Sequence, residues 1–276
     1  QLLVGFGSVL VPQRASAMNV VMLLGNQEAH RLIQQAAVEL RAMIPLGASR
    51  TKATLPSGYG TDTLQLAYDR QLTFETHCNL YLDADADDLV FVTNPSYAVN
   101  VIAKSFALGK GDEVLTTELE YGACDRTWQY YCDKAGARYV KQPIRLPLQS
   151  QEDFVEQLMA GVTKRTKLIF LSHITSSAGI RFPVEKVIDA AKQLGIMTFI
   201  DGAHAPAQVP LSLRSLDADI YTGACHKWMM TPKGSSFLYV RKEYQSLFDP
   251  LVISWGYKAD KPSHSLFLDY HQQQGT

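Results

Sequence analysis

Two predicted strands of this chain each lead to an ionisable side chain. The apolar strand at residues 196–200 runs directly into Asp201. A second strand at residues 218–222 is followed, after a short connection, by Lys227. Ligands of an open α/β sheet bind in the crevice at the carboxyl ends of its strands, so we expect the two side chains to share one site. A buried carboxylate requires a cation there, and a desolvated lysine loses its proton and becomes a nucleophile toward carbonyl groups.

One cofactor, pyridoxal 5'-phosphate, requires both groups. Its aldehyde condenses with a lysine, and its ring nitrogen must stay protonated for the ring to accept electrons. Taken singly, Asp201 could cap the following turn, and Lys227 could be a surface lysine with a buried aliphatic stem. His204 could be a core histidine, or it could exchange a hydrogen bond with the phenolic oxygen of the same ring.

Strands alternate with helices over most of the chain. The apolar patterns predict strands at residues 89–92, 113–117, 138–144, 167–171, 196–200 and 218–222. They predict helices at residues 27–43, 62–82, 97–108, 122–135, 151–160 and 183–195. This alternation is typical of an α/β fold with a mostly parallel sheet covered by helices.

Composition and charge exclude several classes of partner. The 276 residues carry a formal net charge of −1 with scattered basic residues, which predicts no binding to nucleic acid. No apolar run approaches the roughly 20 residues that cross a bilayer, so no membrane segment is predicted. The 4 cysteines form no CxxC pair and indicate free thiols in a reducing compartment, which predicts a cytoplasmic protein. The chain begins at Gln1 rather than Met, which indicates that a preceding piece is missing.

Other side chains near strand ends have two interpretations each. In residues 93–97 the backbone N–H groups and the Ser96 hydroxyl could bind a phosphate, although Ser96 could instead be an ordinary N-cap. Tyr121 could stack on a flat heterocycle or lie in the core. Cys225 could be a nucleophile, but a buried thiol at a strand end is usually inert.

Three histidines allow a different function. His173, His204 and His226 all lie near predicted strand ends, so they could bind zinc as in a hydrolase. Their spacing contains neither an HxxxH nor an HxH pattern. Zinc is therefore the weaker hypothesis, and no metal is predicted.

A series of short motifs occurs in one order along the chain. They are Asp-Leu-Val-Phe-Val-Thr-Asn (88–94), Ala-Val-Asn (98–100), Gly-Asp-Glu-Val-Leu-Thr-Thr (111–117), Glu-Tyr-Gly-Ala-Cys (120–124), Asp-Gly-Ala-His-Ala-Pro (201–206), Cys-His-Lys-Trp (225–228), Pro-Lys-Gly-Ser (232–235), Pro-Leu-Val-Ile-Ser (250–254) and Gln-Gly-Thr (274–276). Together they resemble the class V aminotransferase branch of the fold-type I pyridoxal-phosphate enzymes, closest to its isopenicillin N epimerase-like and cysteine desulfurase-like subgroup. The resemblance implies a seven-stranded, mostly parallel sheet covered by helices.

The resemblance also implies roles for individual residues around the ring of the cofactor. Lys227 would form the Schiff base and act as the catalytic residue. Asp201 would pair with the pyridine nitrogen, and His204 would bond the phenolic oxygen. Tyr121 would lie over the ring.

Further residues would hold the phosphate and the substrate. The resemblance assigns the phosphate to Ser96, the amide of Tyr97, and His226. Thr276 would reach the phosphate of the partner chain in a homodimer with shared active sites. Thr175 or Ser176 would face the substrate.

The resemblance implies a domain organisation with three departures from the family, one of which is that residues 1–60 match the family's glycine-containing entry segment poorly. Residues 61–260 would form the large cofactor-binding domain, and residues 1–60 an N-terminal arm and helix of a small domain or of the segment at the site entrance. Residues 261–276 would begin a truncated segment, because relatives continue into a C-terminal small domain whose arginine grips the substrate carboxylate. Pro95 departs from the family's phosphate turn because proline has no N–H.

The predicted function is that of an enzyme acting on an amino acid or an amino-acid-derived sulfur compound. The substrate amine would displace Lys227, which would then serve as general base at Cα. Transamination, epimerisation or C–S lysis would follow. The alternatives are a non-catalytic binding protein or truncated inactive homologue on the same fold, and the zinc hydrolase.

Overall fold

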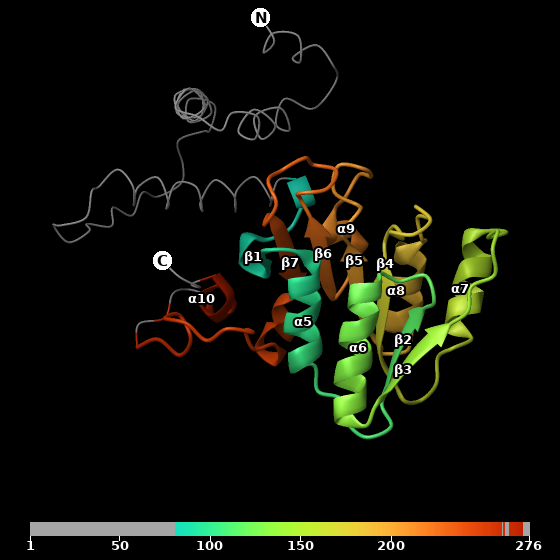
Figure 1. The fold of residues 1–276 in the computed structure, drawn as a ribbon, viewed down its shortest axis with the longest axis horizontal. Helices are drawn as coiled ribbons and strands as arrows, with labels where there is room; N and C mark the ends of the chain where they lie inside the picture. The colour runs from blue at the N-terminus through green and yellow to red at the C-terminus, as the bar shows by residue number, and fades with distance from the viewer. Residues whose placement is uncertain (1–80, 261, 263–264, 273–276) are drawn as a thin grey trace, which may run out of the picture. The chain divides into compact units, whose positions relative to one another are not determined.

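The computed structural model describes residues 81–260, 262 and 265–272 (Figure 1). Its strands are β1 Leu89–Val92, β2 Glu113–Thr117, β3 Arg138–Gln142, β4 Thr166–Ser172, β5 Met197–Gly202, β6 Ile220–Ala224 and β7 Ser236–Val240. Its helices are η2 Ala86–Asp88, α5 Pro95–Ser105, α6 Gly122–Ala135, α7 Gln151–Met159, α8 Val184–Gln193, α9 Leu213–Leu216, η3 Lys242–Leu247 and α10 Leu266–Gln272. The helix predicted at residues 27–43, and nearly all of the one at 62–82, lie outside the described residues.

The seven strands form one sheet in the order β1-β7-β6-β5-β4-β2-β3. Adjacent strands from β6 to β3 pair in parallel, whereas β7 pairs antiparallel with both β1 and β6. The predicted α/β fold with a mostly parallel seven-stranded sheet is thus confirmed. The apolar patterns identified six of these strands and missed β7, although its sequence Ser-Phe-Leu-Tyr-Val is a short apolar run.

Helices cover both faces of the sheet (Figure 1). Side chains alternate between faces along a strand, so in β4 Ile169 and Leu171 pack on one face and Leu168 and Phe170 on the other. The first face is covered by α7 and α8, and the second by α5, α6 and α10. Both faces are therefore apolar and buried, as is usual for parallel strands.

Helix α5 begins two residues earlier than predicted. Asn94 is its N-cap, because its Oδ1 accepts a hydrogen bond from the N–H of Tyr97 at 2.8 Å. Pro95 occupies the first turn, where its missing N–H needs no partner. Ser96 therefore lies inside the helix, and the interpretation of Ser96 as an N-cap is wrong.

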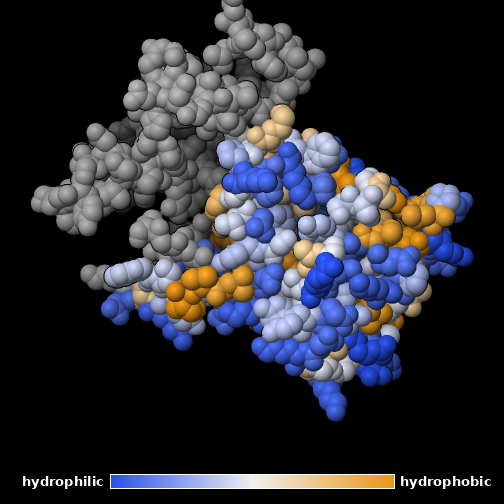
Figure 2. Space-filling view, viewed as in Figure 1, coloured by the Kyte–Doolittle hydropathy of each residue, from blue (hydrophilic) through white to orange (hydrophobic). Residues whose placement is uncertain are grey.

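The surface of the described residues mixes polar and apolar side chains, as the face in Figure 2 shows. Several large exposed apolar side chains follow β7, among them Val252, Ile253 and Trp255, and Trp255 is 86% exposed. No helix among the described residues has both the length and the apolar character needed to cross a membrane.

Gly202, next to Asp201 at the end of β5, should tolerate no side chain. A Cβ at this position would lie 2.0 Å from the hydroxyl oxygen of Tyr221, which is fully buried. Gly202→Ala should therefore lower the free energy of unfolding by about 2 kcal/mol or more, because buried tyrosine cannot move aside without strain. Urea denaturation measures the change. Gly109→Ala is the matched control, since its Cβ would meet nothing closer than 3.4 Å, and an equal loss in both variants would contradict the steric argument.

Candidate active site

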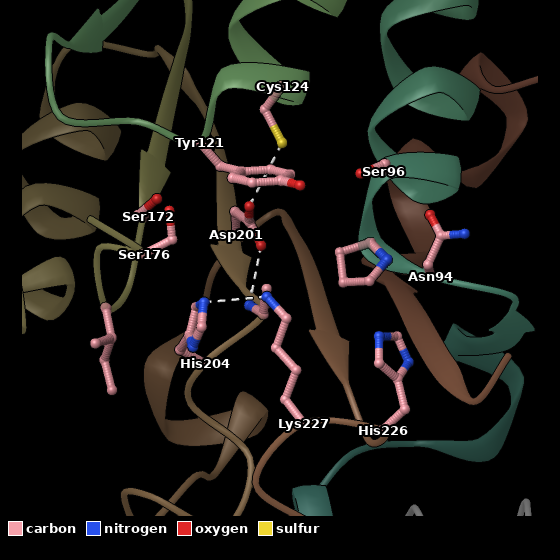
Figure 3. Close-up of a pocket in the computed structure, with 13 residues that line it drawn as sticks. Asn94, Ser96, Tyr121, Cys124, Ser172, Ser176, Asp201, His204, His226 and Lys227 are labelled. Carbon is pink, nitrogen blue, oxygen red and sulfur yellow. Dashed lines mark hydrogen bonds between the residues drawn. The ribbon is translucent and has the colours of Figure 1, made fainter. Parts of the chain in front are cut away.

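A cavity of about 390 Å³ opens at the carboxyl ends of the parallel strands. Its lining comes from the segments that follow β1, β2, β4, β5 and β6, so residues far apart in sequence meet there. In Figure 3 the side chains of Asp201, His204, Lys227 and Tyr121 point into the same space. This is the strand-end crevice in which ligands of α/β sheets bind, and its volume is typical of small-molecule sites, about 300–1,000 Å³.

Asp201 places a buried carboxyl group in this cavity. The side chain is 4% exposed, and its Oδ1 accepts a hydrogen bond from the N–H of Ala203 at 2.9 Å. Its Oδ2 lies 3.6 Å from Sγ of Cys124, which donates to it. Burial raises the pKa of Asp201, which the Ala203 N–H and the charge on Lys227 partly offset. Within the described ranges no cation forms an ion pair with Asp201, so this carboxylate lacks the partner that burial normally demands.

Lys227 enters the cavity from the turn after β6. Its Nζ is 3.0 Å from Nε2 of His204 and 5.9 Å from the centroid of the Tyr121 ring. Burial lowers the pKa of Lys227, and the carboxylate of Asp201 opposes that shift. The pKa of His204 is also lowered, by burial and by the charge that Lys227 carries when it is protonated. Asp201, His204 and Lys227 thus line one cavity, as the sequence analysis expected.

The opposite side of the cavity offers groups suited to an anion. Ser96 and His226 both line it, together with Asn94 and Pro95. Nδ1 of His226 is 3.0 Å from the carbonyl oxygen of Ser235 and donates to it, because a carbonyl only accepts. The Nε2 of His226 is then the nitrogen left to contact a ligand.

Two of the predicted site residues that the structure describes, Tyr97 and Thr175, do not line the cavity. The Tyr97 amide donates to Oδ1 of Asn94, inside the first turn of α5. Thr175 is buried, and its hydroxyl accepts a hydrogen bond from the N–H of Ile180 at 3.0 Å. Only Ser176 of that predicted pair lines the cavity. Thr276 lies outside the described residues.

The three histidines of the zinc hypothesis use their ring nitrogens separately. His173 is buried with its Nδ1 3.0 Å from the Tyr221 hydroxyl, His204 faces Lys227, and His226 bonds a backbone carbonyl. In the part of the chain that the structure describes, no cluster of three His, Cys, Asp or Glu side chains is arranged to hold a metal ion. These contacts argue against the zinc hydrolase.

The cysteines of the described residues are free thiols, and all three are buried. Cys225 does not line the cavity, and burial raises its pKa to about 11, in agreement with an inert thiol. Cys124 does line it, but burial and the neighbouring Asp201 carboxylate raise its thiol pKa far above neutrality. Neither is a thiolate nucleophile at neutral pH.

Sequence reasoning overlooked three polar residues at this site. Cys124 lies one turn beyond Tyr121 in α6, and Ser172 is the last residue of β4, so helical spacing and the strand-end rule would have pointed to both. Behind them lies Glu120, whose carboxylate accepts hydrogen bonds from the Ser172 N–H at 2.9 Å and the Thr117 hydroxyl at 2.7 Å. Burial raises the pKa of Glu120 to about 7.

The shifted pKa of Glu120 should make the stability of the cofactor-free chain depend on pH. The folded chain keeps this proton up to about pH 7, whereas the unfolded chain releases it near the ordinary value of 4.5. The folded state binds more protons in this window, so stability falls as pH rises through it, by an amount on the order of 3 kcal/mol. Glu120→Gln keeps the shape of the side chain, can accept from Ser172 through its amide oxygen and donate to the Thr117 hydroxyl through its amide nitrogen, and should remove most of this slope.

Urea denaturation at about pH 5 and about pH 8 measures the slope across this window. Glu118→Gln, on an exposed residue two positions earlier, is the matched control and should keep the wild-type slope. Equal slopes in the wild type and in Glu120→Gln would contradict the prediction.

Residues 65–267 of the chain match the family described as aminotransferase class V. The match extends over well more than half of the chain, and the chain belongs to this family.

Two curated relatives and one solved structure show how far the likeness extends. The chain is 35% identical over 184 residues to isopenicillin N epimerase of Amycolatopsis lactamdurans, covering 65% of this chain and 46% of that protein. It is 36% identical over 155 residues to a probable cysteine desulfurase of Vibrio cholerae serotype O1, covering 55% of this chain and 37% of that protein. A structure of a C-DES mutant with glycine covalently linked to its PLP cofactor has a TM-score of 0.69 at 17% identity, covering 98% of this chain and 70% of that one. The chain thus spans less than half the length of these curated relatives.

Proposed function

We propose that residues 61–260 form the cofactor-holding domain of a pyridoxal-phosphate-dependent enzyme acting on an amino acid or an amino-acid-derived sulfur compound. The observation that carries the proposal is that a buried Asp201 carboxylate and the Lys227 amine line the same cavity. A buried carboxylate without a cation is costly, and a protonated pyridine nitrogen would supply the missing charge. Membership of the class V family and the PLP-bound C-DES structure support the same cofactor.

The other lining side chains fit the remaining parts of this cofactor. Tyr121 offers an aromatic face to a flat ring, and His204 lies where it can reach a ring substituent near Lys227. Ser96 and His226 offer a hydroxyl and a ring nitrogen to a phosphate. When bound, pyridoxal phosphate supplies an aldehyde that condenses with amines and a ring that withdraws electrons from the attached Cα.

The chain's own groups would move and hold protons. Lys227, as a neutral amine, would take the proton from the substrate Cα as general base, and its lowered pKa favours the neutral form. Asp201 would keep a proton on the ring nitrogen through its negative charge. Cys124, as a donor to Asp201, would hold that carboxylate in place.

The proposal includes transamination, epimerisation and C–S lysis. Sulfur transfer to a protein cysteine requires a thiolate within reach of the substrate. Of the described cysteines only Cys124 lines the cavity, and its pKa is raised far above neutrality. The described residues therefore favour chemistry completed on the substrate itself.

The experiment is a product analysis with the cofactor-loaded full chain. Release of a thiol together with a keto acid would identify C–S lysis. A change of substrate chirality would identify epimerisation. A keto acid without thiol release would identify transamination. Cofactor uptake without turnover of any amino acid or thioether would favour the non-catalytic alternative. A chain that takes up no pyridoxal phosphate would contradict the proposal.

The predicted homodimer belongs to the same proposal, with Thr276 reaching the phosphate of the partner chain. It rests on the family resemblance. The mass of the loaded chain in solution would test it, and a monomer with full cofactor occupancy would contradict it.

A further inference from the structure

The imidazole of His204 lies between two nitrogen-bearing side chains. Its Nδ1 is 3.1 Å from the indole Nε1 of Trp228, and its Nε2 is 3.0 Å from Nζ of Lys227. His204 follows β5, whereas Lys227 and Trp228 follow β6, so the contact joins the ends of two adjacent strands. The two rings are tilted by 56° with centroids 6.5 Å apart, which fits a hydrogen bond at the ring edges rather than stacking.

With the hydrogen bond from Trp228 in place, the chemistry of these three groups permits one arrangement of protons. An indole N–H only donates, so Nδ1 of His204 must be the unprotonated nitrogen that accepts it. The neutral imidazole then carries its hydrogen on Nε2. That N–H points at Nζ of Lys227, which must accept it through a lone pair. An ammonium group has three donors and no lone pair, so Lys227 is a neutral amine in this arrangement.

A charged Lys227 would require a different arrangement. The ammonium would donate to Nε2, and the imidazole hydrogen would have to move to Nδ1. Two N–H groups, those of His204 and Trp228, would then face each other and their hydrogen bond would be lost. The contact with Trp228 therefore favours the neutral lysine over the charged one.

We propose that Trp228 is a positioning residue that holds the hydrogen of His204 on Nε2 and thereby keeps Lys227 in its neutral, nucleophilic form. The same Nε2–H makes His204 a donor, and not an acceptor, toward the phenolic oxygen of a bound ring. This second part rests on the proposed function, whereas the first part concerns only the chain's own residues.

The groups around Lys227 show why a contact that favours the neutral amine is needed. Facing it from other elements are the carboxylate of Asp201, the thiol of Cys124 and the ring of Tyr121. The first two raise the pKa of Lys227, and an aromatic face also attracts a cation. Burial lowers the pKa of Lys227, and His204 adds a contact that only the neutral amine can accept.

The first measurement uses the cofactor-free, full-length wild type. Nitrogen NMR of the chain labelled at histidine reports which ring nitrogen carries the hydrogen, and the His204 signals are those lost in His204→Gln. We expect Nε2 to be protonated and Nδ1 unprotonated at neutral pH. A hydrogen on Nδ1 would overturn the proposal, and this result needs no variant of Trp228.

The second measurement is the reactivity of Lys227 in Trp228→Phe, which keeps an aromatic ring and loses the N–H. Acetylation of Lys227 by acetic anhydride at neutral pH, followed by mass spectrometry of its peptide, should be about fivefold slower, the effect of losing one ordinary hydrogen bond. Both tautomers of His204 should then be populated. Trp255→Phe, at a tryptophan that is 86% exposed, is the matched control and should change neither readout.

An unchanged acetylation rate and an unchanged tautomer in Trp228→Phe would also overturn the proposal. Both readouts belong to the cofactor-free chain, so a failure to bind pyridoxal phosphate would contradict the proposed function alone.

Discussion

Lys227→Ala should abolish the covalent attachment of pyridoxal phosphate to the chain. The loaded wild type should be yellow and should lose that colour on reduction with borohydride, leaving the cofactor attached. The variant has no amine at this position, so borohydride should leave no cofactor on the protein. Any turnover should fall by about a thousandfold or more, because the same amine is the proposed nucleophile and general base.

Lys242→Ala is the matched control for this prediction. Lys242 is an exposed residue of η3 and does not line the cavity, so its variant should behave as the wild type. If the yellow colour and the borohydride trapping were retained in Lys227→Ala, this would contradict the assignment of Lys227 as the residue that binds the cofactor covalently.

Asp201→Asn should weaken cofactor binding and stabilise the cofactor-free fold at the same time. The asparagine can keep the hydrogen bond from Ala203 but has no charge to pair with a pyridine nitrogen. Removing one partner of a buried ion pair costs several kcal/mol, so the dissociation constant for pyridoxal phosphate should rise by about a hundredfold or more. A spectroscopic titration of the full chain measures it.

The gain in stability follows from the raised pKa of Asp201. The cofactor-free fold is favoured while this carboxyl is protonated and loses stability as pH rises above its ordinary value of 3.8. A neutral amide avoids that cost, so at neutral pH Asp201→Asn should be more stable by about 1–3 kcal/mol in urea denaturation. Asp189→Asn, an exposed change in α8, should alter neither property. A cofactor-free Asp201→Asn chain less stable than the wild type would contradict this account.

The fold was predictable because its strands are buried on both faces. The apolar runs of β1, β2, β4 and β5 read directly as strands, and the alternation with helices then implies parallel pairing. β7 was not predicted because a short apolar run alone does not distinguish a strand from a helix. Its antiparallel direction depends on its pairing with β1 and β6, which is a property of the assembled sheet.

The bounds of β6 differ from the prediction by two residues at each end. The strand was predicted at residues 218–222 and lies at Ile220–Ala224. Asp219 precedes the strand, and its carboxylate accepts hydrogen bonds from the N–H of Thr198 at 2.8 Å and from the Thr198 hydroxyl at 3.0 Å. The strand ends at Ala224, nearer to Lys227 than the predicted end at residue 222.

The sequence could predict those residues of the candidate site that follow directly on a strand. It could predict less well the residues whose role depends on contacts formed in the fold. The strand-end rule found Asp201 and Lys227 without any knowledge of the fold. It could not show that the Tyr97 amide donates to Asn94, that Thr175 folds back onto Ile180 or that Trp228 contacts His204. Those contacts depend on turn geometry, which the sequence pattern does not contain.

The most direct test of the central claim is the location of the reduced cofactor on the chain. The full chain is loaded with pyridoxal phosphate, reduced with borohydride, digested and analysed by mass spectrometry. This account predicts that the added mass lies on the peptide containing Lys227. A cofactor attached to a different lysine, with Lys227 unmodified, would contradict it.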